Sequence, residues 1–396
     1  MSDSIPFAAW PQFDDGDVAA VADVLRSGKV NYWTGTEGRT FEREFAAFSG
    51  CHYAVAVANG TVAIELALTV CDIGPGDEVI VTSRTFVGSA SPMVLRGASP
   101  VFSDVDPNSQ NITAETIRQV LTPRTKAILC VHLAGWPCEM DSICELAKAH
   151  DLIVIEDCAQ AHGARYKEKP VGSLGHLAAW SFCQDKIMTT GGEGGMLTTN
   201  DENIWKRAWA FKDHGKSYDT VYRTDHPPGF RWLHESFGSN WRLTEMQAVL
   251  GRRMLLKLPE WLAQRRQHAA TLSEAFRSLP GLRCASPPRH SEHAYYKYYA
   301  FVRPEQLRAG WDRDRVMNAI VARGVPCYSG SCSEIYREKA FAGTGYVPKN
   351  RLPVARELGD TALMWLVHPT LSEEAIRWTA QVVSEVMFEA TIATEG

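Results

Sequence analysis

Short apolar runs alternate with amphipathic segments along the first half of the chain. The runs are rich in valine, isoleucine and alanine, and they lie near residues 53–57, 78–81, 100–102, 127–131, 152–155 and 178–182. Such a repetition of strand and helix is typical of a mainly parallel α/β sheet. Thr61 precedes one of the intervening helical patterns and Asp141 another, and both residue types favour helix starts. We therefore predict an α/β fold whose mainly parallel sheet is flanked by helices.

The second half of the chain has a different pattern. Thr244 and Gln247 have the spacing of a capping box, and a helical pattern runs from there to about residue 279. Beyond it come one strand-like and two helical segments, over residues 293–302, 312–323 and 372–389. This pattern predicts a large domain over residues 1–255 and a smaller C-terminal α+β domain over residues 256–396, connected by the long helix.

Charge and composition narrow the classes of function. The 396 residues include 41 Lys plus Arg and 46 Asp plus Glu, a net charge of −5. Because no basic stripe is present, we expect no nucleic-acid partner. The amino terminus lacks the basic and apolar regions of a secretory signal. No apolar run approaches the roughly 20 residues of a membrane span. We therefore predict a cytoplasmic protein without a membrane partner.

The cysteines could indicate disulfides or a metal site, but their spacing supports neither. Ten cysteines are scattered along the chain without a CxxC pair. Cys327 and Cys332 flank a Gly/Ser loop, where a metal would need further ligands close by. We interpret most cysteines as reduced core residues and predict no metal.

Ligands of a parallel sheet bind beyond the carboxyl ends of its strands, so the residues there are candidates for chemistry. Gly60 and Thr61 follow the first strand and can hold a phosphate or belong to an ordinary helix start. Asp157 ends another strand and can pair with a protonated ring nitrogen or cap the following segment. Lys186 precedes a glycine-rich turn and can form a Schiff base or remain a surface charge. Phe86 can stack on a ring or belong to the core.

Together these groups favour one cofactor. A phosphate cradle, an acidic strand end and a lysine beside a glycine-rich loop are the three attachments that pyridoxal phosphate needs. The carboxylate keeps the ring nitrogen protonated, which makes the ring an electron sink. The sequence therefore predicts that Lys186 and Asp157 bind pyridoxal 5'-phosphate and act as its catalytic partners.

A series of further motifs extends over nearly the whole chain. They are Asn59–Ala63, Gly76–Ile80, Thr85–Val87, Asp104–Pro107, Thr122–Ala127, Val131–Leu133, Glu156–Gly163, Ser181–Phe182, Lys186 with its glycine turn, and Gly238–Arg242. In this order they resemble the sugar aminotransferases of the DegT, DnrJ, EryC and StrS type, within the aspartate aminotransferase fold. The resemblance implies that the large domain binds the cofactor.

The resemblance implies roles around the cofactor ring. Lys186 would form the Schiff base and then move protons between the substrate carbon and the cofactor. Asp157 would pair with the pyridine nitrogen, and Gln160 would hydrogen-bond the phenolic oxygen. Phe86 would stack on the face of the ring.

The resemblance also implies how the phosphate is held. Gly60, Thr61 and Ser181 would bind the phosphate within one subunit. Asn240 would reach the phosphate of the cofactor in the neighbouring subunit. These assignments imply a homodimer with shared active sites.

The implied reaction transfers an amino group from glutamate to a keto group of a nucleotide-linked sugar for aminosugar biosynthesis, and the sequence does not distinguish glutamate from glutamine as the donor. Amination of a free cyclitol would use the same apparatus. Lys186 argues against a sugar dehydratase, which has a histidine in that place, and the intact lysine, aspartate and glycine loop argue against a non-catalytic regulatory protein.

Two segments depart from the family pattern. The turn Thr189–Gly195 has one glycine more than the commoner form. Residues 324–336 replace a His-Tyr-Pro type sequence that many relatives carry near the substrate. The second departure leaves the identity of the sugar and of its nucleotide open.

Overall fold

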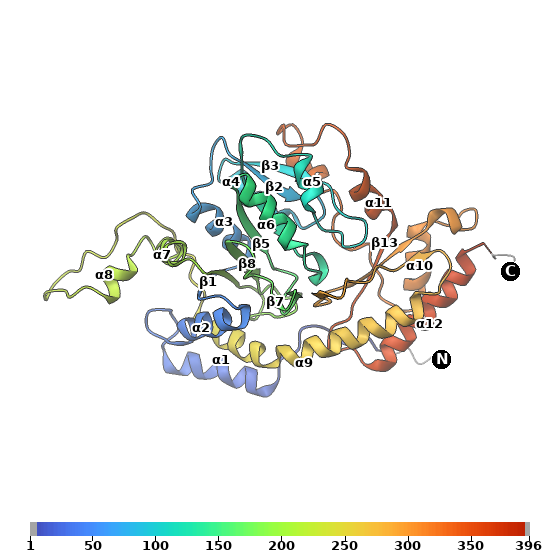
Figure 1. The fold of residues 1–396 in the computed structure, drawn as a ribbon. Coiled ribbons are helices and arrows are strands. Elements are labelled where there is room, and N and C mark those ends of the chain that lie inside the picture. Colours follow the sequence, from blue (N-terminus) through green and yellow to red (C-terminus); the bar gives the residue numbers. More distant parts are fainter. Residues whose placement is uncertain (1–5, 393–396) are drawn as a thin grey trace.

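A seven-stranded sheet forms the centre of the larger part of the molecule (Figure 1). The computed structural model describes residues 6–392. In spatial order the strands are β1 (Tyr53–Val57), β9 (Gly195–Thr199), β8 (Leu177–Ser181), β5 (Ile153–Asp157), β4 (Thr125–Val131), β2 (Glu78–Thr82) and β3 (Ser99–Ser103). Strand β9 is antiparallel to β1 and β8, and the other neighbours pair in parallel. The predicted fold class is confirmed, although the apolar pattern does not predict β9.

Helices cover both faces of this sheet, because the side chains of a strand alternate between its two faces. One face carries α3 (Gly60–Val70), α4 (Ser91–Leu95) and α7 (Glu202–Phe211), and the other carries α2 (Glu37–Ser49), α5 (Ala114–Arg118) and α6 (Met140–Ala149). Leu66 of α3 belongs to one core cluster with Val55 and Val81. On the opposite face, Phe45 of α2 packs edge-on against Trp180. The sheet is therefore buried on both sides.

The helix starts differ in detail from the prediction. Helix α3 is capped by Asn59, whose side chain accepts a hydrogen bond from the backbone N–H of Val62 at 2.9 Å. Thr61 lies inside the first turn instead. Helix α6 follows Glu139, and Asp141 lies in its first turn. An acidic residue is favourable near the positive end of a helix, which explains why the sequence pattern points to Asp141.

The predicted long helix is α9 (Glu245–Phe276), and the capping box of Thr244 and Gln247 is present at its start. It packs against α1 (Asp15–Ser27) and α2 near one end and against α12 (Glu373–Ala390) near the other (Figure 1). The helix continues unbroken through residue 255. The predicted division into residues 1–255 and 256–396 therefore falls inside α9 and stays a prediction.

The C-terminal part has its own antiparallel sheet and core. Its elements are β10 (Leu282–Arg283), β12 (Tyr298–Val302), β13 (Ala362–Trp365), α10 (Arg313–Ala322), α11 (Pro353–Thr361) and α12. A third small sheet joins β11 (Ser291–Glu292) to β6 (Arg165–Tyr166) and β7 (Lys169–Pro170). Because β11 pairs with β6, the two parts are joined by strand pairing as well as by α9.

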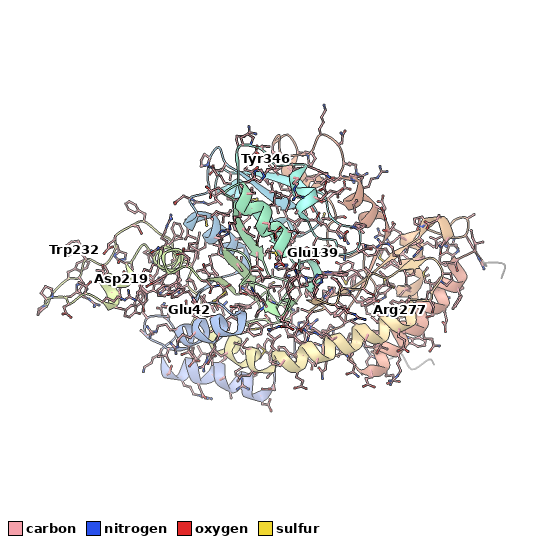
Figure 2. The ribbon with its side chains drawn as sticks, viewed as in Figure 1. Glu42, Glu139, Asp219, Trp232, Arg277 and Tyr346 are labelled. Carbon is pink, nitrogen blue, oxygen red and sulfur yellow. The ribbon has the colours of Figure 1, made fainter. Side chains whose placement is uncertain are left out.

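An arm of the chain, residues 217–238, extends away from the rest of the molecule around α8 (Tyr218–Tyr222) (Figure 1). Phe230, Trp232 and Phe237 on this arm are 78%, 83% and 99% exposed, and Figure 2 labels Trp232 near its tip. Exposed aromatic residues gathered on one segment indicate a contact surface. The arm is therefore a candidate for binding another chain.

Candidate active site

One large cavity, of about 940 Å³, opens beside the carboxyl ends of β5 and β8. The predicted site residues that line it are Gly60, Thr61, Phe86, Asp157, Gln160, Ser181 and Lys186. Residues of the C-terminal part, such as Tyr296 and Tyr328, complete its wall. The fold thus brings together groups that are far apart in the sequence, in a volume suited to a small-molecule site.

Two glycines allow a close approach at the start of α3. A Cβ atom at Gly60 would lie 2.6 Å from the Cβ of Ser181, and one at Gly195 would lie 2.3 Å from the backbone oxygen of Asn59. Only residues without a side chain fit at these two positions. The first-turn N–H groups of α3 and the hydroxyls of Thr61 and Ser181 thus meet at one corner of the cavity. Such a helix start attracts an anion, because its N–H groups and dipole are positive.

Asp157 is the last residue of β5 and is buried. Ser89 donates its hydroxyl to Oδ2 at 2.7 Å, and the backbone N–H of Ala159 donates to Oδ1 at 3.1 Å. Burial raises the pKa of the Asp157 carboxyl, while the hydrogen bond from Ser89 and the charge of Lys186 oppose this shift. A buried carboxylate on a cavity wall gains from a cationic partner, as a protonated ring nitrogen would be.

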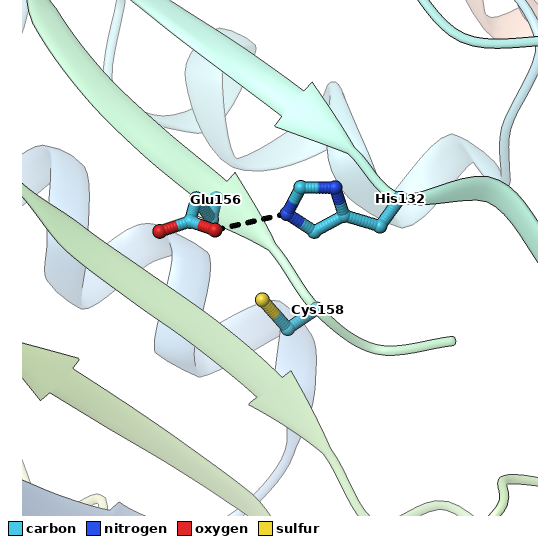
Figure 3. A group of neighbouring side chains, drawn as sticks. All are labelled: His132, Glu156 and Cys158. Carbon is cyan, nitrogen blue, oxygen red and sulfur yellow. Dashed lines mark hydrogen bonds and ion pairs between the residues drawn. The ribbon is translucent and has the colours of Figure 1, made fainter. Parts of the chain in front are cut away.

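Glu156, the residue before Asp157, points to the opposite side of β5. It lies there in a buried group with His132 and Cys158 (Figure 3). His132 Nε2 and Glu156 Oε2 are 2.9 Å apart. The other ring nitrogen, Nδ1, accepts the backbone N–H of Cys138 at 3.0 Å, which requires a neutral ring protonated at Nε2.

Glu156 makes further hydrogen bonds that fill its carboxylate. Its oxygens accept the backbone N–H groups of Gly172, Leu174 and Gly175. Burial opposes the charged form of Glu156, but the hydrogen bond from His132 and those from the backbone of Gly172 and Gly175 lower its pKa. The side chains of His132, Glu156 and Cys158 lie close enough together to bind a metal ion, if distance is the only criterion. Because both oxygens of Glu156 already accept hydrogen bonds, we interpret the group as structural and not as a metal site. It fixes the end of β5 and hence the direction of the Asp157 side chain.

Lys186 lies on the wall of the same cavity. Its Nζ is 3.4 Å from Asp185 Oδ1 and 5.1 Å from the centre of the Tyr296 ring. Tyr296 in turn donates its hydroxyl to Asp185. The indole N–H of Trp10 donates to the backbone oxygen of Lys186 at 2.8 Å, which ties the loop to the N-terminal segment. The lysine is thus positioned by its neighbour Asp185 and by residues from two distant parts of the chain, Trp10 and Tyr296.

The turn after Lys186 needs its glycines. Gly191 and Gly192 have φ angles of +84° and +124°, which are unfavourable for residues with a side chain. The turn leads directly into β9, so it connects the loop that carries Lys186 to the sheet.

Gln160 and Phe86 present different surfaces to the cavity. Gln160 Oε1 accepts the backbone N–H of Ala134 at 2.7 Å, so its amide nitrogen is the end that can donate to a ligand. Phe86 is 69% exposed, which is unusual for a large aromatic side chain inside a pocket. A Cβ atom at Gly88 would lie 2.9 Å from the Phe86 ring, so this glycine makes room for it. The interpretation of Phe86 as a core residue is wrong.

Of the remaining predicted regions, the segment 324–336 lines the cavity and Asn240 does not. Asn240 is exposed and does not line it, and its backbone bridges to Asp213. The segment 324–336 does reach the cavity, where Tyr328 and Ser331 form part of the wall. Tyr299 fixes this segment, since its hydroxyl accepts the backbone N–H of Ser331 at 2.9 Å.

The sequence did not reveal several residues around the reacting groups. They are Trp10, Ser89, Asp185, Tyr296 and Lys297. Most of them come from segments far along the chain from the groups that they contact, so no motif of characteristic spacing marks them in the sequence. Asp185 was the exception, because its place next to Lys186 could have suggested an ion pair.

Comparison with known proteins gives a consistent result. Residues 11–386 match the DegT/DnrJ/EryC1/StrS aminotransferase family. A solved aminotransferase from Psychrobacter cryohalolentis is 57% identical, with a TM-score of 0.95, over 97% of this chain and 99% of that one. DesV from S. venezuelae, in complex with a ketimine intermediate, is 31% identical, with a TM-score of 0.83, over 94% of each chain. GDP-perosamine synthase from Escherichia coli O157:H7 is 33% identical over 89% of this chain and 92% of the relative.

Proposed function

Because the chain belongs to the DegT/DnrJ/EryC1/StrS aminotransferase family, we propose that it transfers an amino group from glutamate to the keto group of a nucleotide-linked sugar. It is an aminotransferase that depends on pyridoxal 5'-phosphate. The proposal is carried by one observation: Lys186, Asp157 and the start of α3 surround a single cavity. Similarity to a GDP-perosamine synthase supports a nucleotide-linked substrate and a step in aminosugar biosynthesis.

The residues of the cavity fit this cofactor. The N–H groups of Gly60 and Thr61 at the start of α3 and two hydroxyls, from Thr61 and Ser181, would form a cradle for the phosphate, since Gly60 approaches Ser181 closely. Asp157 would hold the ring nitrogen, with Ser89 and Ala159 fixing its carboxylate.

Two further side chains would orient the ring. The amide nitrogen of Gln160 would donate to the phenolic oxygen, since its oxygen already accepts from Ala134. The exposed ring of Phe86 would cover one face of the cofactor. When bound, the cofactor supplies an electron sink for the carbanion at the substrate carbon.

Lys186 moves the proton in this scheme. Its Nζ takes a proton from the donor carbon in the first half-reaction and delivers one to the sugar carbon in the second. Asp185, whose Oδ1 is 3.4 Å from Nζ, forms an ion pair with it and restrains its position. Because Tyr296 donates to the same carboxylate, Asp185 is itself held in place.

A panel of substrates tests the proposal. The protein, loaded with cofactor, is incubated with nucleotide-linked ketosugars and either glutamate or glutamine, and the products are weighed by mass spectrometry. A nucleotide-linked aminosugar is the expected product. If free ketocyclitols are aminated while all nucleotide sugars remain unchanged, the proposed substrate class is wrong.

We further propose that the active unit is a homodimer in which each cavity is completed by the partner. Asn240 is exposed and lies outside the cavity of its own chain. It lies two residues after the arm 217–238, whose Phe230, Trp232 and Phe237 side chains are exposed. A second copy that covers these aromatic residues would also receive Asn240 at its phosphate site.

Mixing two inactive variants tests the shared site. Lys186→Ala removes the proton carrier, and Asn240→Asp sets a negative charge against the phosphate, so each homodimer should be nearly inactive. In a mixed dimer, one site holds both lesions and the other holds neither. Random exchange makes about half of the dimers mixed, so activity should recover to about a quarter of the parental value. No recovery after verified subunit exchange would refute the shared-site arrangement.

A cytoplasmic location belongs to the same proposal. All ten cysteines carry free thiols, which matches a reducing compartment. In residues 6–392, no helix combines the length and apolar character needed to cross a membrane. Fractionation of cells should therefore recover the protein together with cytoplasmic markers.

A further inference from the structure

A second lysine, Lys297, faces the cavity beside Lys186. It lies just before β12 and is half-buried. Its Nζ is 4.6 Å from the centre of the Tyr296 ring, and Lys186 Nζ is 5.1 Å from the same centre. The two side-chain nitrogens therefore lie within about 10 Å of each other, on either the same or opposite faces of one ring. Among residues 6–392, no carboxylate forms an ion pair with Lys297, whereas Lys186 has Asp185.

The surroundings of Lys297 make this side of the cavity positive. The titratable groups that face it are Lys186, Asp185, Arg265, Tyr296 and His368. The guanidinium of Arg265 is buried, and it donates to the backbone oxygens of Tyr295 and Tyr296 rather than to a carboxylate. Burial lowers the pKa of His368 to about 3, so this imidazole is neutral. Within residues 6–392, Asp185 is the negative group that acts on Lys297, and Lys186 and Tyr296 already contact it.

We propose that Lys297 binds the α-carboxylate of the amino donor and thereby selects amino acids as donors. This inference rests on the proposed function, which brings an amino acid into the cavity. The α-carboxylate is bonded to the carbon whose proton Lys186 moves, so it must lie near Lys186 Nζ. Lys297 lines the cavity together with Lys186, whereas Arg265 does not, and Lys297 has no carboxylate of its own. An ammonium–carboxylate hydrogen bond is among the stronger kinds.

The diphosphate of a nucleotide sugar is the competing anion. In such a sugar the diphosphate is attached several bonds away from the keto carbon, whereas the α-carboxylate of glutamate is attached directly to the reacting carbon. A cation that shares the Tyr296 ring with Lys186 therefore suits the carboxylate better.

The pKa of Lys297 agrees with this geometry. Burial is the main cause that lowers its pKa to about 8, with Asp185 acting in the opposite direction and Arg265 and Lys186 adding to the shift. An ammonium group that is partly desolvated beside other cations gains more from an anion than a fully solvated one does.

The test separates the two half-reactions of the loaded enzyme. Lys297→Met removes the charge and keeps the length of the side chain, and Lys297→Arg keeps the charge. Lys349→Met, at an exposed site that does not line the cavity, is the matched control. Stopped-flow absorbance of the cofactor gives the rate constant for glutamate and, separately, for the ketosugar.

We expect Lys297→Met to lower the second-order rate constant for glutamate by about 10- to 100-fold, the usual effect of losing a hydrogen bond to a charged group. The constant for the ketosugar should change less than about threefold, and Lys297→Arg and Lys349→Met should stay close to the parent. An equal loss in both half-reactions, a larger loss for the sugar, or no loss at all would overturn the proposal. A larger loss for the sugar would identify the diphosphate as the anion.

A binding measurement makes the result independent of turnover. Glutarate, which has carboxylates but no amino group, is titrated calorimetrically into the loaded enzyme at pH 7 and pH 9, with inorganic pyrophosphate as the second probe. Glutarate binding should weaken at pH 9 in the parent, because Lys297 loses its proton through a pKa of about 8. The Arg variant should keep its binding at pH 9, and the Met variant should bind weakly at both. Pyrophosphate binding that follows the same pattern while glutarate is unaffected would contradict the proposal.

The two proposals fail in different ways. If the parent enzyme does not react with glutamate or glutamine, the proposed function is wrong. If the parent reacts and Lys297→Met reacts equally well, only the role of Lys297 is wrong. Thermal melting and the cofactor absorbance of each variant show whether it is folded and loaded.

Discussion

Asp157→Asn separates the electrostatic role of this residue from its structural role. The change is nearly isosteric, and the surrounding hydrogen bonds can adapt to it. Oδ1 can keep accepting the N–H of Ala159, while the new amide nitrogen takes the place of Oδ2. Ser89 must then accept instead of donate at that position, and its hydroxyl can donate to Thr85, whose oxygen is 2.9 Å away. We therefore expect the variant to fold.

The loss of charge sets the size of the effect on turnover. A carboxylate beside a protonated ring nitrogen, at a hydrogen-bond distance of about 3 Å and an effective dielectric of about 20, is worth about 5 kcal/mol. An amide retains part of this as a dipole. Since about 1.4 kcal/mol corresponds to tenfold, the rate of proton removal should fall by about a thousandfold.

The stability of the cofactor-free protein should change in the opposite direction. Burial raises the pKa of Asp157 in the folded state, so the native protein loses stability as pH rises from the unfolded pKa through the folded one. The neutral amide does not bear this cost. At pH 7, the cofactor-free Asp157→Asn protein should therefore melt at the same temperature as the parent or slightly above it.

Stopped-flow absorbance with glutamate, together with a thermal melt of the cofactor-free protein, tests both expectations. A thousandfold loss of rate in a protein of unchanged or higher melting temperature supports the electrostatic role. Near-parental turnover would refute the reasoning and leave Asp157 as a capping residue. A large drop in melting temperature would show that its hydrogen bonds to Ser89 and Ala159 matter mainly for the fold.

Further variants test the rest of the site. Lys186→Ala should abolish turnover and the visible absorbance of the cofactor–lysine link, and near-parental amino transfer would mean that another residue moves the proton. Ser89→Ala should slow the donor half-reaction by about tenfold, because Asp157 loses a hydrogen bond to its charged form. Gly60→Ala should weaken cofactor binding in equilibrium dialysis, since its Cβ would meet Ser181, whereas Gly74→Ala has room and should not. Tyr328→Phe should affect the sugar half-reaction more than the glutamate one, and equal effects would place this residue away from the sugar.

Local signals in the sequence predicted much of the fold because each depends on neighbouring residues. The β-branched runs predicted the parallel strands, and the capping box at Thr244 predicted the start of α9. The pattern failed at β9, which begins with a glycine and lies between β1 and β8. A buried strand next to a glycine turn has no alternation of polar and apolar residues by which it could be detected.

The residues of the site also fall into two classes, those that a sequence motif predicts and those that it does not, and this difference has a physical reason. Residues that bind the cofactor lie at strand ends and helix starts, where the backbone geometry restricts the residue type and leaves a motif such as the one around Gly60. Residues that hold those groups, such as Trp10 beside the backbone of Lys186 or Ser89 beside Asp157, make one contact across a long sequence separation. Lys297 belongs to this second class, because nothing in its own segment distinguishes it from a surface lysine. Its neighbours distinguish it, since the fold places this half-buried cation, without a carboxylate partner, on the cavity that Lys186 also lines. In this enzyme, a sequence motif can therefore indicate the chemistry, whereas the choice of substrate depends on contacts that only the folded chain creates.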